Sequence, residues 1–222
     1  MTHTLHIGFL VYPGVTQLDF TGPIQFLSQM PGTKVEVLWK EITPIQTDSG
    51  FTINPTMRHD QAPQFDVIVM PGGPGQPRIL EDEDYIDFVR QQGEAARYIM
   101  GVCTGSLTMG RAGLLNGYKA GCHWAFSKEL AKFGCEFVDE RVVVDRNRIT
   151  GGGVTAGMDI ALQMIAELAG ETAAKTIQLA LEYEPSPPFH AGRPELAGPQ
   201  LEAIVRKMFA NSGLTADAGD CQ

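Results

Sequence analysis

A cysteine that directly follows a short apolar run is the residue of this sequence best placed to do chemistry. Residues 98–102 are apolar enough for a buried strand, Cys103 comes next, and residues 104–112 have the pattern of a helix. In open α/β sheets, ligands bind beyond the carboxyl ends of the strands, so a residue at such a turn projects into the binding crevice. A thiol that faces the start of a helix is also expected to ionise more readily, and the thiolate is the reactive form. We therefore predict that Cys103 is a nucleophile.

The other three cysteines give no comparable signal. Cys122 is expected within a strand, Cys135 in a turn and Cys221 in the C-terminal tail. No pair has C-x-x-C spacing and no histidine cluster lies nearby, so the sequence indicates neither a metal site nor a disulfide framework. Most free cysteines are small apolar core residues. On the residues alone, that alternative stays open for Cys103.

Asp19 is the second candidate, because it is a carboxylate in the otherwise apolar run from Val15 to Phe20, just after the first expected strand. Charged groups in such surroundings usually cap a helix or cost much desolvation free energy. A cap for the helix that includes Pro23 is therefore the plain alternative. If Asp19 instead lies beside Cys103, the two groups cannot easily both be negative, and the pair would hold one proton between them.

Several glycines and one histidine complete the candidate site. Gly72 and Gly73 offer backbone N–H groups without a side chain in the way, as does the N–H of Thr104, so together they are candidates for an anion-stabilising hole. An ordinary tight loop is the alternative. Residues 151–153 are three glycines before a helix, but they lack the spacing of a phosphate-binding loop and are interpreted as a closely packed loop near the site. His123 is a possible supporting residue, although a histidine beside Trp is more often structural.

Short apolar runs alternate with amphipathic stretches along the chain, which predicts an α/β protein with a mostly parallel central sheet and helices on both faces. The length of 222 residues fits one domain, with a polar tail from about residue 211 to 222. The expected strands and hairpins cover residues 5–12, 35–39, 45–53, 66–70, 98–102, 141–145 and 148–150. The expected helices cover residues 18–29, 82–92, 104–112, 124–133, 155–168, 171–183 and 201–210.

Charge and hydropathy exclude several classes of function. The chain has 17 Lys and Arg against 26 Asp and Glu, a formal net charge of −9, which argues against a nucleic-acid partner because that binding depends on cations. No apolar run approaches the ~20 residues of a membrane helix, and no secretory signal is visible at the N-terminus. We therefore expect a cytoplasmic protein with reduced thiols and no membrane partner.

Five motifs of the sequence stand out together: Gln17-Leu18-Asp19-Phe20-Thr21-Gly22-Pro23, Met70-Pro71-Gly72-Gly73, Val102-Cys103-Thr104-Gly105-Ser106, Cys122-His123-Trp124-Ala125 and Thr150-Gly151-Gly152-Gly153-Val154-Thr155-Ala156-Gly157. In combination they resemble the ThiJ/PfpI (class I glutamine amidotransferase-like) superfamily, and within it the branch that hydrates isocyanides. The resemblance covers roughly residues 5–195. It implies a flavodoxin-like sandwich, a homodimer, no cofactor, and conversion of a small apolar isocyanide to an N-substituted formamide through a covalent thioimidate. Cys103 matches the family's nucleophile and Asp19 its acidic partner, while Thr104 matches the adjoining backbone.

The same resemblance assigns the Gly72-Gly73 turn, Gly151 and Val154 to the surroundings of the nucleophile. Two departures from sister branches matter. The protease-like branch carries His directly after the nucleophile, where this chain has Thr104, and the glyoxalase-like branch usually carries Glu where this chain has Asp19. Two alternatives remain: a glyoxalase- or deglycase-type enzyme acting on 2-oxoaldehydes, and a non-catalytic sensor of a ligand or oxidant based on Cys103.

Overall fold

A seven-stranded sheet organises the first part of the chain in the computed structural model, which describes residues 4–211. Its strands are parallel except at one edge, where the first and second strands of the following order form an antiparallel pair. The order is β10 (Val142–Asp145), β11 (Arg148–Gly151), β7 (Tyr98–Val102), β6 (Val67–Met70), β1 (Leu5–Leu10), β2 (Thr33–Trp39) and β5 (Met57–Arg58). The carboxyl ends of β1, β6 and β7, three adjacent strands, therefore meet at one edge.

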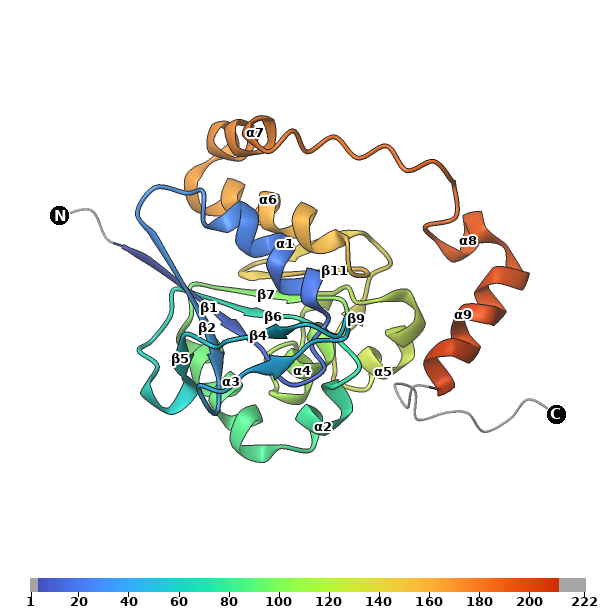
Figure 1. Cartoon of the computed structure of the whole chain (residues 1–222). Helices are drawn as coiled ribbons and strands as arrows, with labels where there is room; N and C mark the ends of the chain where they lie inside the picture. Colours follow the sequence, from blue (N-terminus) through green and yellow to red (C-terminus); the bar gives the residue numbers. More distant parts are fainter. Residues whose placement is uncertain (1–3, 212–222) are drawn as a thin grey trace. The chain divides into compact units, whose positions relative to one another are not determined.

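Helices cover both faces of this sheet (Figure 1). One face carries α1 (Gln17–Leu27) and α6 (Ala156–Ala169), which pack on each other, with α7 (Glu171–Ala180) packed against α6. The other face carries α2 (Gln76–Leu80), α3 (Glu83–Ala95), α4 (Gly105–Arg111) and α5 (Ser127–Ala131). The predicted flavodoxin-like α/β sandwich is confirmed.

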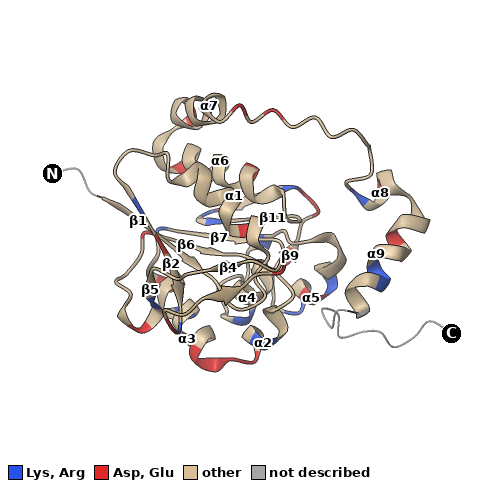
Figure 2. Ribbon diagram, viewed as in Figure 1, with Lys and Arg blue, Asp and Glu red and all other residues tan. Residues whose placement is uncertain are grey.

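The local sequence explains why the central elements form where they do. Strands β6 and β7 consist of apolar residues and glycine, which suits strands covered on both faces, and every residue of β6 is buried. Asp82 is the N-cap of helix α3: its side chain accepts a hydrogen bond from the Tyr85 N–H, and Glu83 and Asp84 lie in the first turn of the helix. Figure 2 shows this acidic group where α2 gives way to α3. This group caps the helix and suits its dipole.

Most predicted elements are present, but several short ones were not foreseen. The predicted hairpin forms as β3 (Ile45–Gln46) against β4 (Thr52–Ile53). The helix predicted from residue 124 to 133 is instead a 3-10 turn at Trp124–Phe126 followed by α5. A second small pair, β8 (Lys119–Ala120) with β9 (Glu136–Phe137), and the 3-10 turn His59–Gln61 are too short to leave a periodic pattern. Cys122 lies just beyond β8, outside the strand expected for it.

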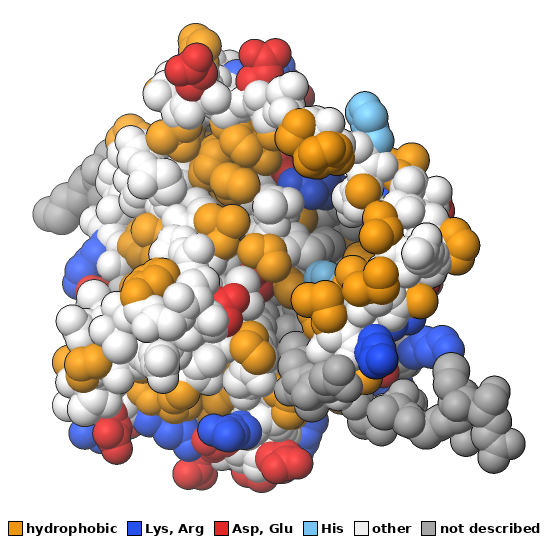
Figure 3. All heavy atoms as spheres, turned by 45° about the vertical axis from the view of Figure 1, so that its right-hand side comes forward, with side chains coloured by type: hydrophobic (Ala, Val, Ile, Leu, Met, Phe, Trp, Pro, Cys, Tyr) orange, Lys and Arg blue, Asp and Glu red, His pale blue; other side chains and the backbone are white. Residues whose placement is uncertain are grey.

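The chain divides into two compact units, one up to Leu181 and one from Glu182 onward. The described part of the second unit contains α8 (Pro194–Ala197) and α9 (Pro199–Asn211). Its exposed apolar side chains include Leu196, Ile204 and Met208, and Figure 3 shows apolar side chains at the surface there. The single domain over residues 1–222 stays a prediction, and most of the tail predicted from residue 211 lies outside the described residues. None of the described helices is long and apolar enough to cross a membrane.

A glycine where α4 begins offers a test of how closely the layers pack. A Cβ atom added to Gly105 would lie 2.0 Å from the carbonyl oxygen of Met70 at the end of β6, and backbone cannot move aside easily. We expect Gly105→Ala to lower the free energy of unfolding by about 1–3 kcal/mol or more, measured by urea unfolding. Gly192→Ala is the matched control, because a Cβ there meets no atom within 4 Å. Equal stability of the two variants would show that β6 and α4 are not in such close contact.

Candidate active site

Cys103 lies on a sharp turn between β7 and α4, with its side chain almost completely buried at 6% exposure. Its φ of 58° is in the left-handed region, which non-glycine residues rarely adopt. The Cys103 N–H donates to the carbonyl of Gly152 at 3.0 Å, and this bond helps to hold the turn. Strained backbone of this kind is concentrated at functional sites. The geometry matches the strand-to-helix turn expected from the sequence.

Asp19 lies in the first turn of α1, but it does not cap that helix. The N-cap is Thr16, and the Asp19 carboxyl is fully buried at 0% exposure. Its Oδ2 accepts a hydrogen bond from the Gly72 N–H at 2.8 Å. The Cys103 thiol lies close enough to this carboxyl to lower its pKa, and among the described residues the second oxygen, Asp19 Oδ1, is buried without a hydrogen-bond partner. The structure therefore brings Asp19 and Cys103 together, and the alternative of a simple helix cap is wrong.

The two groups strongly affect each other's ionisation. Burial raises the pKa of Asp19 well above its usual value, and the hydrogen bond from Gly72 only partly opposes this. Burial also raises the pKa of the Cys103 thiol, and the Asp19 charge raises it further, whereas hydrogen bonds from Thr104 lower it. The net direction for Cys103 is opposite to the lowering expected from the helix start, because desolvation is the larger effect. One negative charge shared by the pair is favoured over two.

Both backbone N–H groups of the Gly72-Gly73 turn already donate hydrogen bonds to side chains. Gly72 donates to Asp19, and the Gly73 N–H donates to Thr104 Oγ1 at 3.2 Å. A Cβ on Gly72 would lie 2.5 Å from that hydroxyl oxygen, so only glycine fits between the two side chains. In this structure the turn positions the acid and Thr104, and neither N–H is left to form the predicted anion hole. Thr104 itself is buried beside the thiol.

The glycine loop after β11 packs against the turn of Cys103 from the other side. Gly151 ends β11, where a Cβ would lie 2.2 Å from the Arg141 carbonyl oxygen, and the next residue accepts the Cys103 N–H bond. A Cβ on Gly153 would lie 2.9 Å from a ring carbon of His123, so the loop and the histidine are in contact. Val154 follows, half-buried, two residues before α6 begins at Ala156. The loop is therefore adjacent to the candidate nucleophile.

His123 begins a 3-10 turn and is held by it. Its Nδ1 accepts a hydrogen bond from the Ala125 N–H at 3.2 Å, and its ring packs against Trp124 and Phe126. Burial lowers the pKa of His123 to about 4, so the imidazole is neutral near pH 7. These contacts favour the structural interpretation of His123 over a direct part in proton transfer.

Two buried residues next to the pair were missed by reasoning from the sequence. The Tyr12 hydroxyl donates to the Pro71 carbonyl at 3.1 Å, and burial raises the pKa of Tyr12, as do the charges of Tyr85, Asp19 and Cys103. Gln76 is 2% exposed, and its amide donates to the Thr104 carbonyl. Tyr12 ends an apolar run and Gln76 follows a Gly- and Pro-rich loop, so each position carried a weak signal of proximity to a strand end.

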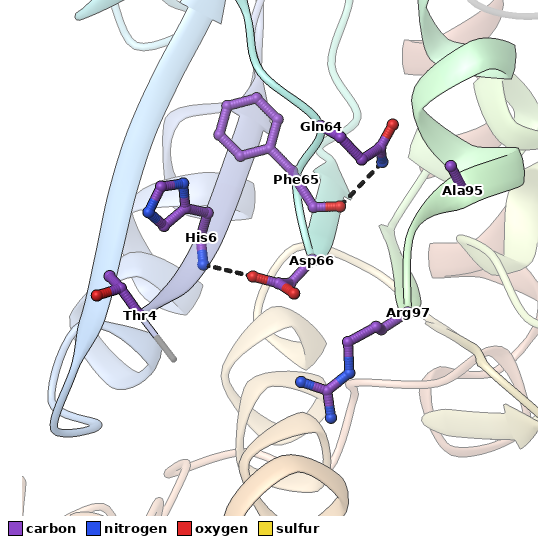
Figure 4. A pocket seen from close by; sticks show the side chains of 7 residues that line it. All are labelled: Thr4, His6, Gln64, Phe65, Asp66, Ala95 and Arg97. Atoms are coloured by element: carbon purple, nitrogen blue, oxygen red, sulfur yellow. Dashed lines mark hydrogen bonds between the residues drawn. The ribbon is translucent and has the colours of Figure 1, made fainter. Parts of the chain in front are cut away.

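A separate pocket of about 440 Å³ lies at the opposite ends of the strands (Figure 4). Its lining includes His6 in β1, Asp66 just before β6 and Arg97 just before β7, and the His6 N–H donates to Asp66. No predicted site residue lines it. Within the described residues, no group of three or more His, Cys, Asp or Glu side chains is arranged to hold a metal ion. The predicted site residues Asp19, Gly72 and Cys103 lie instead at the carboxyl edge of the sheet.

Most of the sequence matches the model of a known protein family. Residues 6–167, which include Asp19, Cys103 and the loops between them, match the model of the DJ-1/PfpI family. The chain belongs to the DJ-1/PfpI family. Isonitrile hydratase of Pseudomonas putida is 45% identical over 94% of this chain and 91% of its own length. The HTH-type transcriptional regulator GbdR of Pseudomonas aeruginosa is 30% identical over 80% of this chain, which spans 50% of that protein.

Solved structures agree with the family assignment. A THiJ/PfpI family protein from Pseudomonas syringae superposes with a TM-score of 0.92 at 41% identity, covering 96% of this chain and 89% of that one. This coverage extends beyond the DJ-1/PfpI match of residues 6–167. The sheet and helices that bring Asp19 and Cys103 together are therefore shared with a solved structure of the same family.

The buried acid generates a pH-dependent prediction. Asp19→Asn keeps an oxygen acceptor for the Gly72 N–H and removes the charge. Because burial raises the pKa of Asp19, the unfolded chain releases this proton at lower pH than the folded chain does. As pH rises from about 4 to the raised folded pKa, the parent should lose stability relative to Asp19→Asn, as measured by urea unfolding across pH.

Asp145→Asn provides a control of opposite sign, because the Arg146 side chain lowers the pKa of Asp145. The parent should gain stability relative to this variant as pH rises through the ordinary carboxyl range. A stability difference between parent and Asp19→Asn that stays constant with pH would contradict the burial of an ionisable pair.

Proposed function

We propose that this protein hydrates isocyanides to N-substituted formamides, with Cys103 as nucleophile and Asp19 as proton donor and acceptor. The observation that carries the proposal is the buried contact between these two side chains at the carboxyl edge of the sheet. The 45% identity to an isonitrile hydratase over nearly the whole chain supports the choice of substrate. The neutral His123 leaves Asp19 as the acid placed beside the sulfur.

The first step forms a carbon–sulfur bond. The Cys103 thiolate attacks the terminal carbon of R–N≡C, and the Asp19 carboxyl gives its proton to that carbon. The product is a thioimidate, R–N=CH–S, on Cys103, and Asp19 is left as a carboxylate. The raised pKa of Asp19 keeps the proton available for this step near neutral pH. Total charge at the pair is unchanged, because the negative charge moves from sulfur to carboxylate.

The second step restores both residues. Water loses a proton to the Asp19 carboxylate while its oxygen adds to the thioimidate carbon, and the Asp19 carboxyl passes this proton to the nitrogen to give R–NH–CH(OH)–S. Collapse of this adduct breaks the carbon–sulfur bond, releases the formamide R–NH–CHO, and expels the Cys103 thiolate. The Asp19 carboxylate takes the hydroxyl proton lost in the collapse, so the pair returns to its starting protonation state. One carboxyl group thus acts first as acid and then as base.

A small apolar substrate suits this site, since the pair already carries one negative charge in buried surroundings and a second anion would be repelled. The proposal includes no cofactor, because both steps use only the two side chains and water. A homodimer and a cytoplasmic location, expected from the family resemblance and from reduced thiols, belong to the same proposal.

The direct test is turnover of an aryl isocyanide, with formamide measured by chromatography. We expect Cys103→Ser to reduce turnover to the uncatalysed rate, and Asp19→Asn to reduce kcat by about 10²–10⁴-fold, the usual contribution of general acid–base catalysis. Cys122→Ala is the matched control, because Cys122 is also buried but is not part of the proposed chemistry. It should keep near-parental activity.

Two results would overturn the proposal. Near-parental turnover by Cys103→Ser would remove the nucleophile from the scheme, provided circular dichroism shows both proteins folded. Absence of formamide with the parent protein, together with loss of methylglyoxal in a parallel assay, would favour the glyoxalase-type alternative. Absence of both reactions would favour a sensor that binds without turnover.

A further inference from the structure

The surroundings of Thr104 contain a buried amide that the proposed chemistry does not use. Gln76 lies at the start of α2 and is 2% exposed. Its Nε2 donates to the carbonyl of Thr104 and, at 3.3 Å, to the hydroxyl of Thr108. A carbonyl oxygen can only accept, so the amide nitrogen must face Thr104. Burying an amide costs free energy unless it is hydrogen-bonded, and these bonds fix its position.

Gln76 also holds the loop that contacts Thr104 from the other direction. Its backbone N–H donates to the Gly73 carbonyl at 3.0 Å, and the Gly73 N–H donates to Thr104 Oγ1. The loop itself has little freedom, because a Cβ on Gly75 would lie 1.9 Å from the Pro13 carbonyl oxygen. Gln76, Gly73 and Thr104 therefore form a closed ring of hydrogen bonds that ties the β6–α2 loop to the start of α4.

The ring also occupies the Thr104 hydroxyl. Its Oγ1 accepts from the Gly73 N–H, so its own proton stays available for donation, and the hydroxyl and N–H of Thr104 lie close enough to Cys103 to act on its thiol. Both interactions lower the pKa of the thiol, against the larger raising effects of burial and of the Asp19 charge. Bonds of this kind are stronger to a charged acceptor than to a neutral one.

We propose that Gln76 is a positioning residue that holds Thr104 in the orientation from which its hydroxyl and N–H stabilise the Cys103 thiolate. Gln76 acts through Thr104 and does not touch the substrate. The inference deepens the proposed function, since it names what favours the reactive form of the nucleophile. It is tested by the reactivity of the thiol itself, so it stands or falls independently of which substrate is turned over.

The test compares the pH dependence of Cys103 alkylation by iodoacetamide, followed by mass spectrometry of the peptide that contains Cys103. Gln76→Met keeps the length of the side chain and removes the donor. We expect its alkylation midpoint to lie at higher pH and its rate at pH 7 to fall on the order of tenfold, as for a weakened hydrogen bond to a charged group. Thr108→Val, which removes one anchor of the amide, should shift the midpoint in the same direction by less.

Gln92→Met is the matched control. Gln92 is another buried amide, which donates to the Pro63 carbonyl and accepts from the Phe65 N–H, away from the candidate site. It should lower the melting temperature while leaving the alkylation midpoint unchanged. The proposal is overturned if Gln76→Met keeps the parental midpoint, or if Gln92→Met shifts it equally. If Gln76→Met does not fold, a parental midpoint in Thr108→Val overturns it instead.

Discussion

The candidate site depends on two acidic groups that share a space from which water is nearly excluded. Each group alone would be neutral there, because desolvation raises the pKa of both the Asp19 carboxyl and the Cys103 thiol. A second negative charge is opposed further, because the Coulomb repulsion between the two groups is strong at low dielectric. When Asp19 holds the proton, its raising effect on the pKa of Cys103 disappears, and the hydrogen bonds from Thr104 then oppose burial alone. The reactive state is thus one proton arrangement of the pair.

The sheet produces this contact by bringing three loops to one edge. Strands β1, β6 and β7 are adjacent and parallel, so the segments that follow them carry Asp19, Gly72 and Cys103 to the same place. Close backbone approaches then fix the distances, since a Cβ at Gly72 or Gly105 would overlap Thr104 or the Met70 carbonyl. Packing at this edge therefore controls the electrostatics of the pair, because the backbone decides how near the two side chains lie.

The sequence predicted the features that depend on hydrophobic periodicity and on the position of a residue relative to a predicted strand. Buried strands, the turn at Cys103 and the carboxylate after β1 all leave local signals, and the fold class followed from them. Contacts between residues that are distant in the sequence leave no such signal. The sequence around Asp19 also fits a helix cap, and nothing in it shows that the Gly72 and Gly73 N–H groups already donate to Asp19 and Thr104. The net direction of the Cys103 pKa also depends on burial, which only the packed structure supplies.

Gln76 is another residue whose role could not be predicted from the sequence. Its position after a Gly- and Pro-rich loop is typical of an ordinary helix start, yet its buried amide connects that loop to α4. A neutral donor suits this place better than a charged one. A lysine would bring an unpaired cation into buried surroundings at high cost, and a carboxylate would add a second negative charge near the pair. The amide fixes Thr104 without changing the charge of the site, so the balance between Asp19 and Cys103 remains set by those two groups.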